Sequence, residues 1–513
     1  MTDPHTEVLP ADARPWAAAW STHGAQSYVA GAWHASTDPD EAGAERTNPA
    51  NGTLLGRVPY ASPRDVHAAV SAAGTAFAPG SPWRALSRRE RARVLHRIGA
   101  LIRDHEAELA TLIALENGKL YTEALHDDMP DTADVFDYYA GWTDKLYGEW
   151  SPVDSLPGAS SATMNVVTRD PIGVCALIVP WNFPLLLAAW KIAPALAMGN
   201  TVVVKPSPFT PFSLLRLVDL IHQADLLPPG VLNVVLGDAE TGNALVTHPG
   251  VAKVSFTGST AVGREILGGI ANSNLATITL ELGGKSPNIV FDDVADLEGC
   301  IDRSFHLMFS QKGEKCSEPT RFLLHESVHD EFVAGLVQRA DAVVCGDPFD
   351  PRATQGSQCT AAQMARLLDG IEDAHADGAH LVAGGVRDVS GTNTTGLFLR
   401  PTIFTDVTPE MRLFRDEVFG PLLAITRFST EAEAVLLAND TPYGLAAGVY
   451  TASSARARRV ANALDAGQVF VNRYGCYDFA APFGGTKGSG WGREMGRASL
   501  DAYTTAKSIW FAD

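Results

Sequence analysis

The feature that most constrains the fold is a repeated alternation of short apolar strands with helices, which begins at residue 172. In residues 172–271, each run of four to six mostly apolar residues is followed by a helical segment of ten or more. Strands of this kind pair in parallel and are covered by helices on both faces. The sequence therefore predicts an α/β fold with a Rossmann-like parallel sheet, an architecture typical of nucleotide-binding domains.

Further elements are predicted on both sides of this region. Helical periodicity covers residues 64–119, and another helix is predicted at 131–147. A strand at 276–282 leads into a second α/β block. Its predicted elements are strands at 286–291, 321–326 and 422–428 and a helix near 328–342.

A chain of 513 residues is too long for one ordinary core. We predict a nucleotide-binding domain from residues 1–147 and 172–283 and a catalytic α/β domain from 284–482. The Ser/Pro-rich stretch 148–171 and the tail 483–513 are predicted to form a small β flap for oligomerisation. The tail ends extended and apolar, and such a strand needs a partner, for which another subunit is one candidate.

Composition excludes several classes of partner. The net charge of −19 argues against nucleic acid and against anionic membrane surfaces. The six cysteines form no CxxC pair and no Cys/His cluster with zinc spacing, so we expect free thiols, a reducing compartment and no metal. The acidic, proline-broken start resembles no signal or transit peptide, and we predict a cytoplasmic protein.

Three residues are candidates for covalent chemistry. Cys316 lies in SQKGEKCSEPTR, where Lys312 and Lys315 would favour a thiolate, although an inert buried cysteine is the alternative. Glu281 ends a predicted parallel strand, where α/β proteins place their sites, but it could be a surface carboxylate. Asn182 lies between two prolines ahead of an apolar helix, where it could cap that helix or donate to an oxyanion.

Two further segments could bind a dinucleotide. In FTGSTAVG, Gly258 and Gly263 bracket a strand-to-helix turn whose backbone N–H groups could hold a pyrophosphate. A tight turn without a function is the alternative. Lys205 leaves a predicted parallel strand at the same edge of the sheet, where it could bind ribose or phosphate or could be a plain surface lysine.

Together these segments resemble the aldehyde dehydrogenase superfamily. The match is ordered from about residue 170 to 497, and YYAGW at 138–142 extends it upstream. The family's motifs that occur here in its order are PWNFP, NTVVVKPS, FTGSTAVG, ELGGKSPNIV, GEKCSEPTR, EVFGP, NDTPYGLAAGVYT and PFGGTKGSGWGRE.

The resemblance implies a role for each catalytic residue. Cys316 attacks the aldehyde carbon, and Asn182 stabilises the oxyanion together with the backbone N–H of Cys316. Hydride passes to NAD(P), and Glu281 activates the water that hydrolyses the thioester. Because relatives that transfer the acyl group to coenzyme A lack this glutamate, Glu281 favours release of a free acid. Lys191 and Glu494 match positions thought to relay the proton from Glu281.

The resemblance also implies NAD as the cofactor, with NADP as an alternative. Lys205 would bind the adenosine ribose, Glu417 the nicotinamide ribose, and Phe419 would pack by the nicotinamide. Many NAD-preferring relatives have a glutamate three residues after the lysine, where this chain has Pro208, and Ser207 could donate to a 2′-phosphate. The other implied cofactor-binding residues are Val179, Pro180, Trp181, Gly258, Ser259 and Leu282.

The motifs also place residues around the aldehyde tunnel. Most are aromatic or apolar, which favours an apolar or aromatic aldehyde. Asp128 and Asp131 are three apart and, with Trp190 and Tyr477, could instead bind the ammonium of an aminoaldehyde, unless they form a solvated helix face. Lys315 could attract a carboxylated aldehyde. The implied tunnel residues are Asp128, Asp131, Phe183, Leu187, Trp190, Lys315, Ser317, Tyr477 and Phe483.

Two other classes of protein compete with this interpretation. Cys316, Glu281 and Lys285 could belong to an amidohydrolase without redox chemistry, but the strand–helix half and the FTGSTAVG turn argue against it. A catalytically silent relative could lose Cys316, Asn182 or Glu281, and all three are present. The resemblance implies a homodimer or homotetramer that binds a small-molecule aldehyde, with no nucleic-acid or membrane partner.

Overall fold

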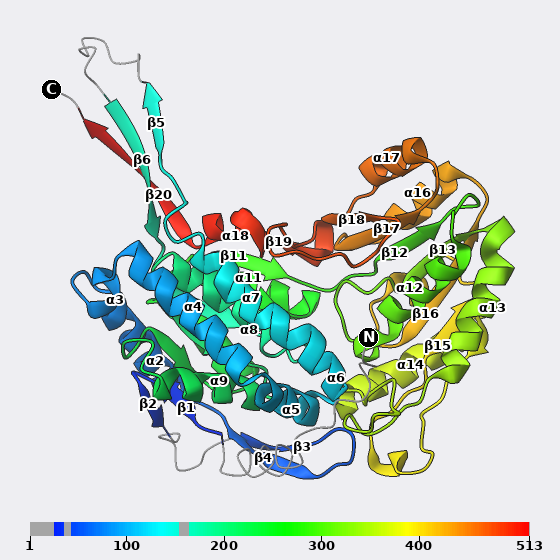
Figure 1. Ribbon diagram of the computed structural model, residues 1–513, viewed down its shortest axis with the longest axis horizontal. Helices are drawn as coiled ribbons and strands as arrows, with labels where there is room; N and C mark the ends of the chain where they lie inside the picture. Colours follow the sequence, from blue (N-terminus) through cyan, green and yellow to red (C-terminus); the bar gives the residue numbers. More distant parts are fainter. Residues whose placement is uncertain (1–24, 35–42, 153–163, 512–513) are drawn as a thin grey trace.

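The structure is a computed structural model that describes residues 25–34, 43–152 and 164–511. The predictions for residues 1–24, within the first predicted domain, and for 153–163, within the predicted flap, lie outside the described residues. The described part of the chain contains two large sheets, a projecting three-stranded sheet and a two-stranded hairpin (Figure 1).

The predicted parallel sheet is present and has eight strands in the order β19-β11-β10-β7-β8-β9-β1-β2. Strands β7 to β11 run parallel, whereas β1, β2 and β19 add antiparallel edges. The strands predicted between residues 172 and 282 are therefore confirmed. Their bounds are β7 Val174–Ile178, β8 Thr201–Lys205, β9 Leu232–Val234, β10 Lys253–Thr257, β11 Thr277–Glu281, β1 Ser27–Val29, β2 Ala32–His34 and β19 Gly490–Trp491.

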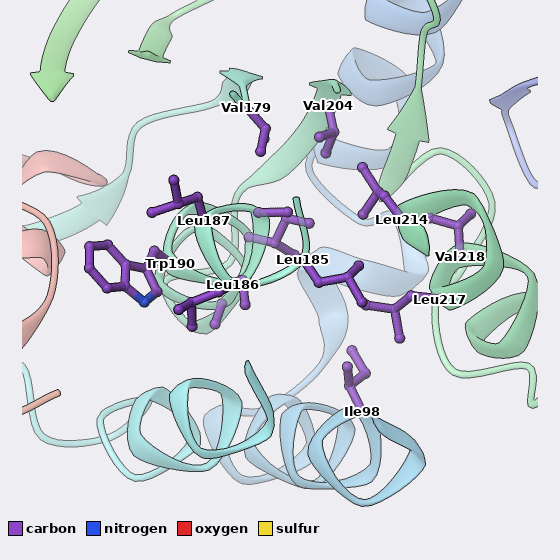
Figure 2. Close-up of a cluster of buried hydrophobic side chains, with 14 of the residues drawn as sticks. Ile98, Val179, Leu185, Leu186, Leu187, Trp190, Val204, Leu214, Leu217 and Val218 are labelled. Carbon is purple, nitrogen blue, oxygen red and sulfur yellow. The ribbon is translucent and has the colours of Figure 1, made fainter. Parts of the chain in front are cut away.

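Helices cover both faces of this sheet. One face packs on α4, α5, α7, α8 and α9, and the other on α2, α10 and α11. Figure 2 shows the first layer, where Leu185 of the turn before α8 and Leu214 of α9 lie beneath Val204 of the sheet. No helix among the described residues has the length and apolarity needed to cross a membrane. The bounds are α2 Pro63–Phe77, α4 Arg88–Asp104, α5 Glu106–Asn117, α7 Met129–Ala140, α8 Leu186–Ala197, α9 Phe212–Gln223, α10 Ala239–Val246 and α11 Thr260–Ala271.

Local capping divides the helical region predicted at 64–119. Ser62 and Asp65 form a reciprocal capping box at the start of α2, and Ser87 and Glu90 form another at the start of α4. The short helix α3, Pro82–Ala85, lies between them. The next predicted helix, 131–147, is shorter than expected, because α7 ends at Ala140 and turns follow it.

The second sheet has seven strands in the order β14-β15-β16-β13-β12-β17-β18, and only β14 is antiparallel to its neighbour. Helices α12 and α13 pack on one face, and α14, α16 and α17 on the other. The bounds are β12 Pro287–Val290, β13 Arg321–His325, β14 His380–Ala383, β15 Thr402–Thr405, β16 Leu422–Phe428, β17 Ala446–Tyr450, β18 Gln468–Val471, α12 Leu297–Phe309, α13 Glu326–Ala342, α14 Ala361–Asp377, α16 Glu431–Asn439 and α17 Ser454–Ala463.

The chain ends in an arm that projects from the body of the molecule (Figure 1). After β19 joins the first sheet, the chain forms α18, Gly496–Ala502, and then β20, Thr504–Phe511. Strand β20 pairs along its whole length with β6, Met164–Pro171, and β6 pairs with β5, Glu149–Pro152. The apolar tail therefore finds its first partner within its own chain, while the other edge of β20 pairs with no described strand.

Candidate active site

The site lies where the carboxyl ends of β10 and β11 meet the segment that follows α12. Glu281 is the last residue of β11, and Cys316 lies in a turn after the short 3-10 helix Ser310–Gly313. A Cβ on Gly284 would come within 2.8 Å of the backbone O of Cys316, so the two segments touch. Cys316 also packs against the apolar cluster on one face of the eight-stranded sheet, although its own segment leads into β13 of the seven-stranded sheet.

Burial raises the pKa of the Cys316 thiol to about 12, and the carboxylates of Glu281 and Glu417 act in the same direction. The prediction that the neighbouring lysines favour a thiolate is therefore wrong. Lys312 Nζ donates to Asn117 Oδ1 at 2.7 Å and pairs with a glutamate carboxylate, so its charge is neutralised away from the sulfur. Lys315 Nζ donates to a serine hydroxyl at 2.8 Å and pairs with another glutamate at 3.1 Å.

The turn that presents Cys316 is held in an unusual backbone conformation. Gln311 and Lys312 have φ of +52° and +60°, and Gly313 has φ of +69°. A Cβ on Gly313 would lie 2.4 Å from the carbonyl carbon of Gly420, so no larger residue fits there. The Glu123 carboxylate accepts from Gln311 N at 2.6 Å. These contacts fix the path of the chain just before the thiol.

Glu281 is a buried carboxylate whose two oxygens have no hydrogen-bond partner in the described structure. Burial and the Glu494 carboxylate raise its pKa well above the usual range, and Lys191 and Arg493 oppose them. A Cβ on Gly484 would lie 2.5 Å from Glu281 Oε1, so this glycine makes room for the carboxylate. Once ionised, such a group is a stronger base than an ordinary carboxylate.

Behind Glu281, Lys191 and Glu494 form a buried ion pair. Lys191 Nζ also donates to Thr257 Oγ1 at 2.7 Å, and Ser255 Oγ donates to Glu494 Oε1 at 2.9 Å. The structure thus brings together Glu281, Lys191 and Glu494, which the resemblance had grouped from distant parts of the sequence.

Asn182 is buried and does not cap the helix that follows it. Helix α8 begins after Leu185 and has no side-chain cap, so that alternative is wrong. Instead, Asn182 Nδ2 donates to the backbone O of Glu314 at 2.9 Å, two residues before Cys316. The amide donor is therefore held beside the thiol.

The predicted dinucleotide turn closes tightly on the end of β11. Gly258 N donates to Glu281 O at 3.0 Å, and Ser259 caps α11 by accepting from Val262 N at 3.3 Å. A Cβ on Gly263 would lie 2.8 Å from Leu282 Cδ2, so a glycine is needed for this close packing of helix on strand.

Glu417 approaches the same edge from the second domain. Its Oε1 accepts from Gly284 N at 2.9 Å, and a Cβ on Gly283 would lie 1.9 Å from its Oε2. Burial raises the pKa of Glu417 to about 7. Phe419 has φ of +64°, and its ring meets Trp181 edge-on at 5.4 Å between centroids.

The loop after β8 contains the other predicted cofactor residues. Lys205 is buried rather than on the surface, and burial lowers its pKa to about 8, while Asp238 opposes this shift. Val179, which precedes Pro180, donates from its backbone N to Lys205 O at 3.1 Å. Ser207 Oγ accepts from the backbone N of residue 209 at 3.2 Å, and Pro208 follows it with no side-chain acceptor.

Aromatic side chains surround the thiol on its other side. Trp190 and Phe483 meet edge-on at 5.1 Å between ring centroids, and Phe483 lies 5.8 Å from Tyr477. Tyr477 donates to Ser317 Oγ at 2.7 Å. Leu187 and Trp190 project from the same side of α8 (Figure 2). The structure therefore assembles an apolar, aromatic wall beside Cys316.

The predicted acidic pair does not form a joint cation site. Asp128 is buried and pairs with Lys119 at 2.7 Å, and the Lys119 ammonium lies 4.1 Å from the centre of the Phe183 ring. Asp131 is exposed. Burial raises the pKa of the Asp128 carboxyl to about 6. Asp128 already has an internal ammonium partner, so its predicted role in binding a substrate ammonium is wrong.

Several residues that hold the site were missed by sequence reasoning. Asn117 anchors Lys312 and also donates from Nδ2 to Trp181 O at 2.9 Å, which links the turn before the thiol to the loop after β7. It stands with Lys119 in ENGK after a helix. This sequence is typical of a helix end, and Gly118 indeed ends α5 with φ of +83°. No local signal distinguishes these side chains from ordinary capping residues.

Comparison with known proteins agrees with this geometry. The profile of the aldehyde dehydrogenase family matches residues 33–509. Human retinal dehydrogenase 2 is 42% identical over 463 residues, which cover 90% of this chain and 87% of the human protein. An NAD+ complex of an aldehyde dehydrogenase from Bacillus cereus superposes with a TM-score of 0.92 at 39% identity and covers 97% of this chain and 98% of its own.

A third relative has an aromatic aldehyde in its name. An indole-3-acetaldehyde dehydrogenase from P. syringae, solved as a mutant with NAD+ and IAA, superposes with a TM-score of 0.91 at 38% identity and covers 95% of this chain and 96% of its own. The chain belongs to the aldehyde dehydrogenase family, a family of NAD(P)-dependent oxidoreductases. The predictions of the family, the α/β fold class, the enzyme class and NAD as the cofactor are confirmed.

Proposed function

We propose that this enzyme oxidises an apolar or aromatic aldehyde to the free carboxylic acid through a thioester on Cys316. One observation carries the proposal. Glu281, buried and with both oxygens unpartnered, lies near enough to Cys316 for its charge to raise the thiol pKa. A nucleophile beside an unsatisfied buried base is the arrangement that acyl transfer followed by hydrolysis requires.

The residues present fit a dinucleotide. Gly283 leaves space that Glu417 enters, Gly258 and Ser259 open the twelve-residue helix α11, and Lys205 places a cation at the end of β8. These residues, with Phe419, would hold NAD+. Bound NAD+ would supply the acceptor for the hydride that leaves the substrate carbon.

The chain's own residues account for the remaining steps. The Cys316 sulfur bonds to the aldehyde carbon as its thiol proton passes to water, and Asn182 Nδ2 donates to the oxygen that becomes negative. After oxidation to the thioester, Glu281 takes a proton from water, and the water oxygen attacks the acyl carbon. The carbon–sulfur bond breaks, the acid leaves, and the sulfur regains a proton. The Glu494 carboxylate, which is held by its ion pair with Lys191, then accepts the proton that Glu281 holds.

The aromatic wall supports the substrate class. Trp190, Tyr477 and Phe483 offer apolar faces beside the thiol, and retinal and indole-3-acetaldehyde are the aldehydes in the names of two relatives. The aminoaldehyde alternative is weaker, because Asp128 is paired with Lys119 and only Asp131 remains exposed. A carboxylated aldehyde is also disfavoured as the substrate, because the Lys315 cation that would attract it is paired with Glu318.

An aldehyde panel assayed with both cofactors tests the proposal. We expect absorbance at 340 nm to rise with aromatic and long-chain aldehydes, at higher kcat/KM than with 3-aminopropanal or 4-aminobutanal. Because Pro208 removes the charge that would repel a 2′-phosphate, NADP+ is expected to serve within about a thousandfold of NAD+. A preference for aminoaldehydes over hexanal would overturn the substrate class, and a larger preference for NAD+ would exclude dual use.

Replacing Asn182 with alanine is expected to lower kcat by on the order of 10²–10³, because one oxyanion donor is lost. The change also frees the backbone O of Glu314, so the melting temperature is measured alongside the steady-state rate. Asn462→Ala, at an exposed position on α17, is the matched control and should leave both quantities unchanged. Wild-type kcat in a folded Asn182→Ala protein would remove Asn182 from the mechanism.

A further inference from the structure

A guanidinium from a distant part of the chain lies against the loop that follows β8. Arg46 belongs to β3, Gly43–Thr47, which forms a hairpin with β4, Leu54–Pro59. Its Nε donates to the backbone O of Pro208 at 2.5 Å, and its Nη2 donates to the Tyr60 hydroxyl at 3.0 Å. Its guanidinium carbon lies 4.9 Å from the centre of the Phe209 ring. Three contacts thus hold the cation beside Pro208.

The guanidinium is anchored but retains binding capacity. An arginine has five N–H donors, and here Nε and one donor each of Nη1 and Nη2 make contacts, the Nη1 contact being long, at 3.4 Å to Glu45 O. Within the described part of the chain, no carboxylate forms an ion pair with Arg46. An anion that reached the loop would therefore meet a fixed, unneutralised cation.

The position of this loop at the end of β8 indicates which anion Arg46 would bind. In nucleotide-binding parallel sheets, a carboxylate near the end of the second strand binds the hydroxyls of the adenosine ribose, and a nearby arginine accommodates a 2′-phosphate instead. Strand β8 pairs directly with β7 and ends at Lys205, and Pro208 follows it without a carboxylate. Arg46 is therefore placed where the 2′ substituent of a dinucleotide would lie.

We propose that Arg46 is a specificity-determining residue that binds the 2′-phosphate of NADP+ and lets this enzyme use NADP+ beside NAD+. The inference rests on the proposed function in so far as both use the same dinucleotide site. A planar guanidinium with two donors left suits a phosphate, which it can bind through parallel N–H···O bonds. Lys205, which is buried at the end of β8, would help to neutralise the negative charge that the 2′-phosphate adds.

Calorimetric titration with cofactors and with fragments that lack nicotinamide tests this role without turnover. The dissociation constants of NADP+, NAD+, 2′,5′-ADP and AMP are measured for the wild type, for Arg46→Met and for Arg57→Met. Arg57 lies on β4 of the same hairpin, so its variant controls for the lost charge and for the fold of the hairpin. We expect Arg46→Met to weaken the binding of NADP+ and 2′,5′-ADP by about ten- to hundredfold and the binding of NAD+ and AMP by less than about twofold. Arg57→Met should change none of the four.

A second variant tests the same inference independently if Arg46→Met disturbs the fold of the hairpin. Pro208→Glu restores a carboxylate at the loop and should weaken 2′,5′-ADP while NAD+ still binds. Equal weakening of NAD+ and NADP+ in Arg46→Met, or unchanged 2′,5′-ADP binding in both variants, would overturn the inference.

The proposed function and this inference fail in different ways. Normal aldehyde oxidation with an unchanged NADP+ dissociation constant in Arg46→Met would overturn the inference alone. A wild type that binds 2′,5′-ADP through Arg46 but oxidises no aldehyde would overturn the proposed function alone.

Discussion

Replacing Cys316 with serine is expected to lower aldehyde oxidation by on the order of 10⁴–10⁶, measured as the steady-state rate of absorbance change at 340 nm. A hydroxyl is a far poorer nucleophile than a thiol, and Glu281 is the carboxylate placed to help remove its proton. The substitution removes only the sulfur, so cofactor binding and the melting temperature should stay close to those of the wild type.

Cys345→Ser is the matched control for this change. Cys345 is also buried, and burial raises the pKa of its thiol to about 12, as for Cys316. It contacts Leu399 and Gln355 and lies apart from Glu281 and Asn182. An inactive Cys345→Ser protein beside an active Cys316→Ser protein would contradict the assignment of the nucleophile. The comparison isolates what makes Cys316 reactive, since burial raises the pKa of both thiols and the two differ in their neighbours.

Replacing Glu281 with glutamine is expected to stop the reaction after one turnover. Acylation would still produce about one equivalent of NADH per subunit, but hydrolysis of the thioester would slow by about 10²–10⁴ because the general base is gone. Stopped-flow absorbance should therefore show a burst followed by a slow phase, and mass spectrometry should show the acyl group on Cys316. A full steady-state rate without a burst would exclude Glu281 as the base.

The raised pKa of Glu281 gives this prediction a pH signature. The carboxyl must lose its proton to act as a base, so wild-type hydrolysis should rise with pH through its elevated pKa, and the glutamine variant should lose that rise. Stability should respond in the opposite sense. The folded-state pKa lies above the unfolded one, so the stability associated with the protonated group is present at low pH and is lost as pH rises through the folded pKa.

Glu116→Gln is the control that separates the pH effects of Glu281 from those of a buried carboxyl outside the site. Glu116 is buried, and burial raises its pKa to about 8, but its carboxylate accepts from the backbone N of Phe212 and Ser213 at the start of α9. Its variant should change the pH dependence of stability while the burst and the pH dependence of turnover stay as in the wild type. Loss of the alkaline rise in both variants would assign that rise to folding.

The sequence predicts the strands well where both faces are buried. Strands β7 (VCALI) and β8 (TVVVK) are almost unbroken apolar runs, and β10 (KVSFT) and β11 (TITLE) alternate apolar with polar residues, and both patterns lie between turn residues. Element ends were less predictable. The helix predicted at 131–147 ends at Ala140, because amphipathic spacing continues past the point where tertiary packing ends the helix.

The candidate site was predicted in its residues more than in its electrostatics. Cys316, Glu281 and Asn182 converge, as ordered motifs suggested, but the directions of side chains depend on partners far along the chain. Lys312 turns towards Asn117, 195 residues away, and not towards Cys316 as predicted. Asp128 turns towards Lys119, nine residues away, and not towards the substrate. Short-range spacing carries no information about such partners.

The left-handed turn before Cys316 also bears on the order in which the site is assembled during synthesis. Its anchors, Glu123 and Asn117, lie about 190 to 200 residues earlier in the chain, whereas Gly484, which makes room for Glu281, is translated about 170 residues later than the thiol. During synthesis, Asn182 and Glu281 therefore emerge before Cys316, whereas Glu417 and Glu494 emerge after it. The complete site can assemble only once the chain has been made beyond residue 494.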